Sequence, residues 1–185
     1  MKILNLNVEG FRSLKHVVEW QPGNLNVLIG PNGSGKSNLL RVLELLAVSA
    51  QSGLGKLVQS CGGMEPLVWD GAVDAIRVKV KCSPIDARRD ATKDSLTYEL
   101  RLERVGNSGE YRIGYEMLGN YWKVEQKLEA QPYKLLERQG LRAKVYDEQQ
   151  RGLAAPEENV PVLETLLSLG KSFLEICLWT RRMSR

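Results

Sequence analysis

The sequence predicts an α/β (α+β) fold, and three observations support this class. Apolar and polar residues alternate with a period of two near the N-terminus and through the middle third of the chain, which is typical of strands with one buried face. Between these regions, an apolar run from Leu39 to Val48 follows the period of a helix. A glycine-rich loop, residues 30–37, precedes that helix.

The N-terminal elements are expected to be two short strands followed by a buried one. Residues 4–8 alternate strictly, and a second strand around Val17 and Val18 leads into a turn at residues 21–24. Residues 25–29 are mostly apolar, which is typical of a strand that is buried on both faces.

The next segment should be a helix from residue 37 to about residue 50. Its polar stripe contains only Arg41 and Glu44, so we expect it to be buried on most sides. Residues 51–63 are rich in glycine and serine and are interpreted as the end of this helix and a loop.

The middle third of the chain predicts an antiparallel meander, because the strands are joined by turns and not by helices. A linker over residues 151–161 and a helix over residues 162–174 should follow it. The expected strands of the meander cover residues 76–82, 96–102 and 111–117, with weaker candidates at 133–137 and 142–146.

Composition restricts the class of protein. The chain has 185 residues, 43% of them hydrophobic and 26% charged, as expected for one globular domain or slightly more. No apolar run is long enough for a membrane span and no secretory signal is visible, so we expect no membrane partner and a cytoplasmic location. Cys61, Cys82 and Cys177 are interpreted as buried small hydrophobic residues.

The net charge of +4 permits DNA as a partner but does not require it. Clusters of arginine occur only at residues 88–89 and 181–185, and both are interpreted as solvated surface.

Residues 30–37, GPNGSGKS, match the phosphate-binding pattern G-x-x-x-x-G-K-[ST]. For a chain of this composition, the pattern is expected by chance on the order of one time in a hundred. The glycines let the backbone wrap around phosphate, and its N–H groups and the helix N-terminus supply positive charge. Lys36 should reach the β- and γ-phosphates, and Ser37 should ligate Mg²⁺. The motif therefore predicts MgATP or a similar triphosphate as ligand, bound by Gly30, Asn32, Gly33, Ser34, Gly35, Lys36 and Ser37.

The segment KILNLNVEGFRSLKHVVEW…NVLIGPNGSGKSNLLRVLELL resembles the N-terminal lobe of ABC-type AAA ATPases of the RecF/SMC/Rad50/OLD group. The resemblance is specific over residues 2–46 and implies ATP and Mg²⁺ as cofactors, a role in DNA repair or phage defence, and a homodimeric or partner ATPase head. It implies an antiparallel β-subdomain beside a sheet that carries the P-loop. It also adds Asn38 and Arg12, from the GFRSLK segment, to the nucleotide-binding residues.

Other motifs of that family have no convincing counterpart in this sequence. The Walker B strand, which ends in two acidic residues, is imitated only by residues 67–70 and 173–175, and the signature loop only by residues 167–170. His16 precedes the P-loop and is interpreted as a surface or turn residue. The family also has a magnesium-sensing glutamine, and five residues are equal candidates for it: Gln126, Gln131, Gln139, Gln149 and Gln150.

These differences predict an apparently truncated ATPase head: residues 1–170 would form the N-terminal lobe and residues 171–185 a tail. We expect ATP binding without turnover at the rate of the family. Alternatives are a noncatalytic nucleotide-binding module that docks on a partner, or another P-loop class such as a small nucleotide kinase or GTPase. A GTPase would normally show an N/T-K-x-D string, and the sequence has none.

Overall fold

The computed structural model describes residues 2–49, 53–71, 73–83, 94–106, 109–124, 127–128, 133–140, 142–146 and 152–154. Within this part of the chain, strands outnumber helices, and the two helices follow each other between the second and third strands. The elements are β1 (Ile3–Phe11), β2 (Leu14–Trp20), α1 (Lys36–Ser49), α2 (Leu54–Ser60), 3₁₀ turns at Glu65–Leu67 and Trp69–Gly71, β3 (Ala75–Cys82), β4 (Asp94–Val105), β5 (Glu110–Val124), β6 (Lys127–Leu128), β7 (Tyr133–Gln139), β8 (Arg142–Tyr146) and β9 (Gly152–Ala154).

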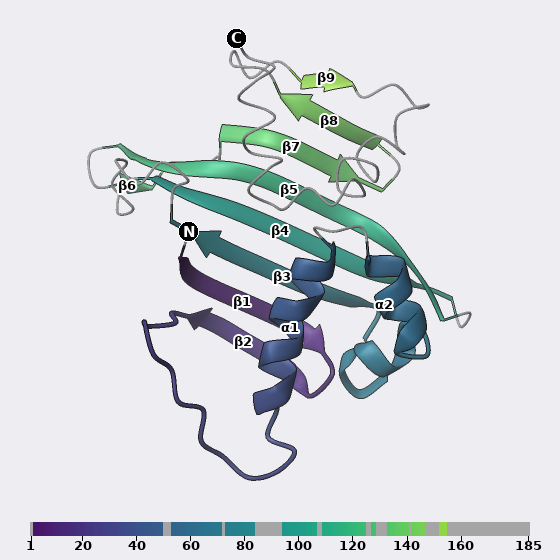
Figure 1. The fold of residues 1–185 in the computed structure, drawn as a ribbon. Helices are drawn as coiled ribbons and strands as arrows, with labels where there is room; N and C mark the ends of the chain where they lie inside the picture. Colours follow the sequence, from purple (N-terminus) through teal and green to yellow (C-terminus); the bar gives the residue numbers. More distant parts are fainter. Residues whose placement is uncertain are drawn as a thin grey trace.

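The strands form one antiparallel sheet in the order β2-β1-β3-β4-β5-β7-β8-β9, with β6 paired to β5 beside this path (Figure 1). From β3 onward, the strands of this path follow one another in chain order, with β6 between β5 and β7, which is the predicted meander. Strand β1 departs from chain order because it pairs with both β2 and β3. The described residues therefore confirm the α+β class and all five strands predicted for the meander.

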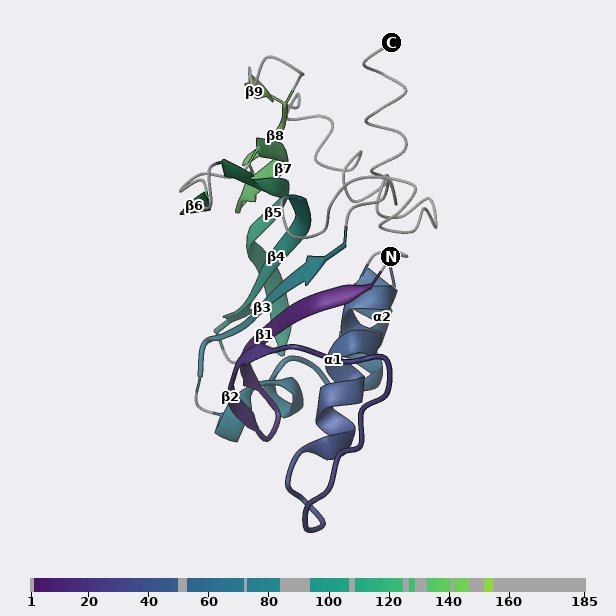
Figure 2. The same cartoon turned by 90° about the vertical axis from the view of Figure 1, so that its left-hand side faces the viewer.

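The helices α1 and α2 lie against one face of this sheet (Figure 2). Alternation places Val8, Val78 and Leu100 on the covered face, where the register brings them side by side, and each is no more than 3% exposed. Val42 and Leu45 of α1 complete the core from the helix side. Burial of these apolar side chains is the main stabilising term of the fold.

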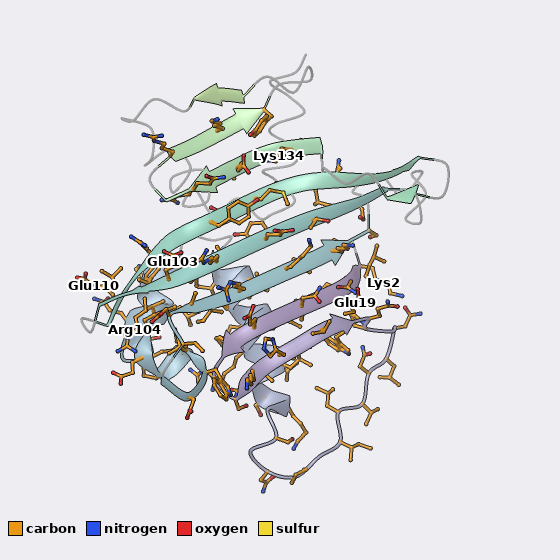
Figure 3. All side chains as sticks on the ribbon, turned by 180° about the vertical axis from the view of Figure 1, so that it is seen from behind. Lys2, Glu19, Glu103, Arg104, Glu110 and Lys134 are labelled. Atoms are coloured by element: carbon orange, nitrogen blue, oxygen red, sulfur yellow. The ribbon has the colours of Figure 1, made fainter. Side chains whose placement is uncertain are left out.

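The opposite face carries charged side chains, and neither of the described helices covers it (Figure 3). At several positions a carboxylate faces a cation on the neighbouring strand, which stabilises a sheet modestly. The ion pairs join Arg77 to Glu9 at 3.0 Å, Lys79 to Glu99 at 2.5 Å and Arg112 to Glu103 at 2.7 Å. These pairings make the face a mixture of both charges, which is the solvated surface that a charged strand pattern predicts.

The strand predicted over residues 25–29 is wrong. These residues form no strand, and the side chains of Leu25, Val27 and Ile29 are 86%, 73% and 91% exposed. A doubly buried strand needs a hydrogen-bonded neighbour and a covered face, and no described strand pairs with this segment. Apolar composition alone therefore did not place it in the sheet.

Two predictions about the helical region also need correction. Helix α1 has the predicted bounds within one residue, but it is not buried on most sides, because Leu40 is 63% exposed and burial is confined to one stripe. Helix α2 occupies part of the segment for which the sequence predicts a helix end and a loop, because Leu54 and Val58, four residues apart, both reach the core.

The cysteines divide into different environments. Cys82 is buried as predicted, and burial raises the pKa of its thiol to about 11. Cys61 is only partly buried, which corrects the prediction for that residue. Cys177, the arginine clusters at 88–89 and 181–185, and the helix expected over 162–174 lie outside the described residues.

Candidate functional site

The glycine-rich loop follows the connection of residues 21–29, which leaves β2, and it enters α1 at Lys36 (Figure 1). Gly33 and Gly35 have φ angles of +84° and +94°, in a region that residues with a side chain rarely adopt. A Cβ atom on Gly35 would also lie 2.9 Å from both the Ser13 Oγ and the Leu14 Cδ2. The backbone conformation therefore favours glycine at position 35, and any larger residue would also have to displace the ends of the Ser13 and Leu14 side chains.

The Lys36 side chain folds back into its own loop. Its Nζ donates hydrogen bonds to the backbone oxygens of Gly30 and Pro31, at 2.7 and 2.6 Å, and to the Ser34 Oγ at 3.3 Å. Three donors thus meet three acceptors of the loop, which is the full capacity of an ammonium group. The positive charge is held inside the loop, where an anionic ligand could exchange for these neutral acceptors.

The first turn of α1 provides backbone donors beside this charge. The first helical hydrogen bond runs from the Leu39 N–H to the Gly35 oxygen at 3.0 Å, so the preceding N–H groups have no acceptor within the helix. The first turn contains no acidic residue. A helix N-terminus of this kind attracts phosphate through its N–H groups and its partial positive charge.

The turn between β1 and β2 touches this loop and is itself anchored in the core. Phe11 is 1% exposed and forms an isolated β-bridge with Val68, while the Arg12 N–H donates to the Leu67 oxygen at 2.9 Å. Arg12 has a φ of +48°, an uncommon conformation for a residue with a side chain. The anchor on the 3₁₀ segment holds this turn in place.

The Arg12 side chain contacts Cys61 and Phe11, and no contact with the glycine-rich loop is found among the described residues. Its guanidinium donates to the Cys61 Sγ at 3.5 Å and lies 5.9 Å from the centre of the Phe11 ring. A nucleotide contact through Arg12 thus stays a prediction, and it would require this side chain to turn. The next residue, Ser13, does reach the first turn of α1, because the Asn38 Nδ2 donates to its Oγ at 2.8 Å.

Ser13 is a residue that sequence reasoning missed. A serine between two strands is common in turns, and nothing in its spacing relates it to a helix that begins 23 residues later. The only signal for Ser13 in the sequence is its place in the GFRSLK segment, directly after Arg12.

The remaining candidates lie elsewhere. Leu67 and Val68 are buried in and after a 3₁₀ turn, and Asp70 has a φ of +53°, so this segment is no strand ending in a carboxylate. His16 is exposed on β2, and Gln139 is exposed on β7; both line the hollow on the open face of the sheet. The other glutamines and the signature-like residues 167–170 lie outside the described residues.

A protein-only metal centre has no support in the described part of the chain, which contains no group of three or more His, Cys, Asp or Glu suited to a metal ion. Magnesium that accompanies a nucleotide needs no such group, because phosphate oxygens and water supply most of its ligands. The exposed Ser37 hydroxyl, in the first turn of α1, is of the right chemistry to add one protein ligand.

A buried polar cluster lies at the other end of α1. Tyr98, Glu116, Arg138 and Ser49 are each less than 9% exposed, and the Tyr98 hydroxyl donates to the Glu116 Oε1 at 2.7 Å. Burial, with the neighbouring Glu116 carboxylate as a second cause, raises the pKa of Tyr98 well above its usual value of 10. This cluster secures the C-terminal end of α1 to the sheet.

A match to a protein family covers the part of the chain that contains this site. Residues 1–102 match the family described as AAA ATPase domain, which is more than half of the chain. A chromosome condensation protein of Caenorhabditis elegans, dpy-27, is 32% identical over 123 residues. That alignment covers 61% of this chain but only 8% of the relative.

Neither described helix is long and apolar enough to cross a membrane.

Proposed function

The chain belongs to the AAA ATPase domain family, and from this premise we propose that it binds MgATP in the loop formed by residues 30–38. The observation that carries the proposal is the position of Lys36, whose ammonium is enclosed by three oxygens of the loop at the N-terminus of α1. Gly33 and Gly35 give the loop its shape, and the N–H groups of the first helical turn would hold the phosphates. Ser37 would complete the coordination of Mg²⁺.

Binding requires Lys36 to leave its present acceptors. The ammonium would exchange two backbone oxygens and a hydroxyl for charged phosphate oxygens, which form stronger hydrogen bonds with it. Its aliphatic stem belongs to the first helical residue, so the charge can move while the helix stays in place. The loop is thus suited to bind triphosphate without refolding.

Calorimetric titration of the chain with a nonhydrolysable ATP analogue and Mg²⁺ tests this proposal. We expect saturable binding by the wild type and at least a tenfold loss of affinity in Lys36→Ala, because a charge-assisted contact is worth about 1.5–3 kcal/mol. Lys56→Ala is the matched control, since Lys56 is an exposed lysine on α2. Equal affinity in the wild type and Lys36→Ala would refute the assignment.

The biological setting that we propose is a nucleotide-dependent role on DNA, in repair or phage defence, as in RecF and OLD proteins. A distant relative is a chromosome condensation protein, which supports a connection with DNA, although the chain spans only 8% of that relative. The carboxylates and the signature loop needed for hydrolysis would come from a further segment or from a partner ATPase head. Adenine would be held by stacking or apolar contacts, so ATP should be preferred over GTP only modestly.

A second candidate is a noncatalytic nucleotide-binding module that docks on a partner. The exposed apolar side chains of Leu25, Val27, Ile29 and Leu40 favour it, because single domains rarely leave so many large apolar side chains in water. Phosphate release measured with and without a partner head separates the two candidates. Turnover by this chain alone, abolished in Lys36→Ala, would exclude the noncatalytic module.

A further inference from the structure

We propose that Ser13 is a positioning residue of the phosphate-binding loop, acting through Asn38 and Gly35. This inference rests on the proposed MgATP site and adds a residue to it that lies outside the glycine-rich motif. Ser13 belongs to the β1–β2 turn, far from the loop in sequence but in direct contact with it.

The first step of the argument is that Ser13 is held by the fold and not by a mobile loop. The residue before it donates its N–H to the Leu67 oxygen at 2.9 Å, and Phe11 is 1% exposed beside Val68. On the other side, Leu14 begins β2 and pairs with Phe11. The Ser13 hydroxyl is therefore presented from a turn that is fixed on both sides.

The second step is that this hydroxyl meets the loop on both sides of Lys36 and Ser37. It accepts a hydrogen bond of 2.8 Å from the Asn38 side chain, which lies just after them. It also lies so near Gly35, just before them, that any Cβ there would be 2.9 Å from the Oγ. The two residues expected to touch phosphate and Mg²⁺ are thus bracketed by contacts to one serine.

The third step concerns energy. The Ser13–Asn38 hydrogen bond is exposed to solvent, so water can replace it and its loss should affect the stability of the whole chain little. Phosphate binding needs several N–H groups of the first helical turn in one arrangement, and small displacements there reduce affinity. Loss of the hydrogen bond should therefore weaken nucleotide binding more than it weakens folding.

The test compares binding and unfolding in Ser13→Ala. We expect the Kd for a nonhydrolysable ATP analogue with Mg²⁺ to rise about 3- to 10-fold, and the unfolding temperature without nucleotide to stay within about 3 °C of the wild type. Ser13→Thr keeps the hydroxyl and should restore most of the affinity. Ser60→Ala is the control, because it also removes an exposed serine hydroxyl, but one that donates to the Leu57 oxygen of its own helix and does not belong to the phosphate-binding loop.

A double-mutant cycle examines whether Ser13 acts through Asn38. If it does, Ser13→Ala should add little to the loss caused by Asn38→Ala. Strictly additive losses would contradict action through Asn38, and wild-type affinity in Ser13→Ala would refute the positioning role. If Ser13→Ala binds like the wild type but Lys36→Ala does not bind, the positioning role is refuted and the proposed MgATP site is retained. If the wild type does not bind the analogue, the MgATP site and the positioning role are both refuted.

Discussion

Strand β3 alternates apolar with charged residues and residues 25–29 are mostly apolar, but only the apolar side chains of β3 are buried. Strand β3 lies between β1 and β4, and Ile76 and Val78 on its covered face are at most 2% exposed. In residues 25–29, by contrast, Leu25 and Ile29 are 86% and 91% exposed. The difference shows that apolar composition gives a segment the capacity to be a strand, while neighbouring strands and a covering helix decide whether it becomes one.

This difference also determines which segments fix the position of the phosphate-binding loop. A buried strand over residues 25–29 would fix the N-terminal end of the loop. Here the loop is instead attached through α1, whose Val42 and Leu45 are buried, and through the turn that presents Ser13. Substitutions in the two regions should thus have very different effects on stability.

The largest effect is expected in the buried strands. Leu102→Ala removes a side chain that is 0% exposed in β4, and it should lower the free energy of unfolding by about 2–5 kcal/mol through lost burial and a cavity. Urea unfolding followed by circular dichroism measures this change. A loss below about 1 kcal/mol would mean that the sheet is not packed against the helices as described.

A comparable loss is expected from a single methyl group at the edge of the core. Gly10 has a φ of +74°, and a Cβ there would lie 2.6 Å from the Ala75 backbone oxygen. Gly10→Ala should therefore destabilise the chain by about 2 kcal/mol or more. Gly33→Ala, also at positive φ but with no atom within 4 Å of the added Cβ, should cost less in the same unfolding assay.

Tyr98→Phe should cost about 1–3 kcal/mol, because it leaves the buried Glu116 carboxylate without the hydroxyl that donates to it. The pKa of Tyr98 is raised in the folded chain by burial, then by Glu116. The unfolded chain therefore loses this proton first, and the contribution of Tyr98 to stability should decline as the pH rises above about 10. Unfolding measured at pH 8–11 should show a shallower alkaline decline in Tyr98→Phe, and an unchanged decline would contradict the assignment.

The smallest effect on stability is expected at Ile29, the exposed last residue of the segment 25–29. Ile29→Ala changes a side chain that is 91% exposed, so the free energy of unfolding should change by no more than about 0.5 kcal/mol. A loss as large as that of Leu102→Ala would show that residues 25–29 are buried in solution, by a partner copy or by another segment.

The alternating strands and the phosphate-binding loop could be predicted from local sequence. The alternation of apolar and polar residues in 76–82 indicates a strand with one covered face, and the spacing from Gly30 to Ser37 indicates a phosphate-binding loop before a helix. Each pattern lies within one short stretch of sequence, so it can be recognised without knowing the rest of the fold. The helix bounds followed from the same kind of local period.

Features that depend on distant partners could not be predicted. The burial of residues 25–29 was overestimated because the sequence does not say which strands would flank them. Ser13 was missed because its partner, Asn38, is 25 residues away, and the Arg12 side chain turns toward Cys61 through a contact across 49 residues. Local patterns carry no information about such pairs.

The central claim is that the backbone N–H groups of the loop and the first turn of α1 bind triphosphate, and NMR titration of ¹⁵N-labelled chain with a nonhydrolysable ATP analogue and Mg²⁺ tests it most directly. We predict saturable shifts concentrated in the amides of residues 32–38, with Gly35 and Lys36 among the largest, and their loss in Lys36→Ala. Shifts confined to the charged open face of the sheet, or no saturable shift in residues 32–38, would contradict the account.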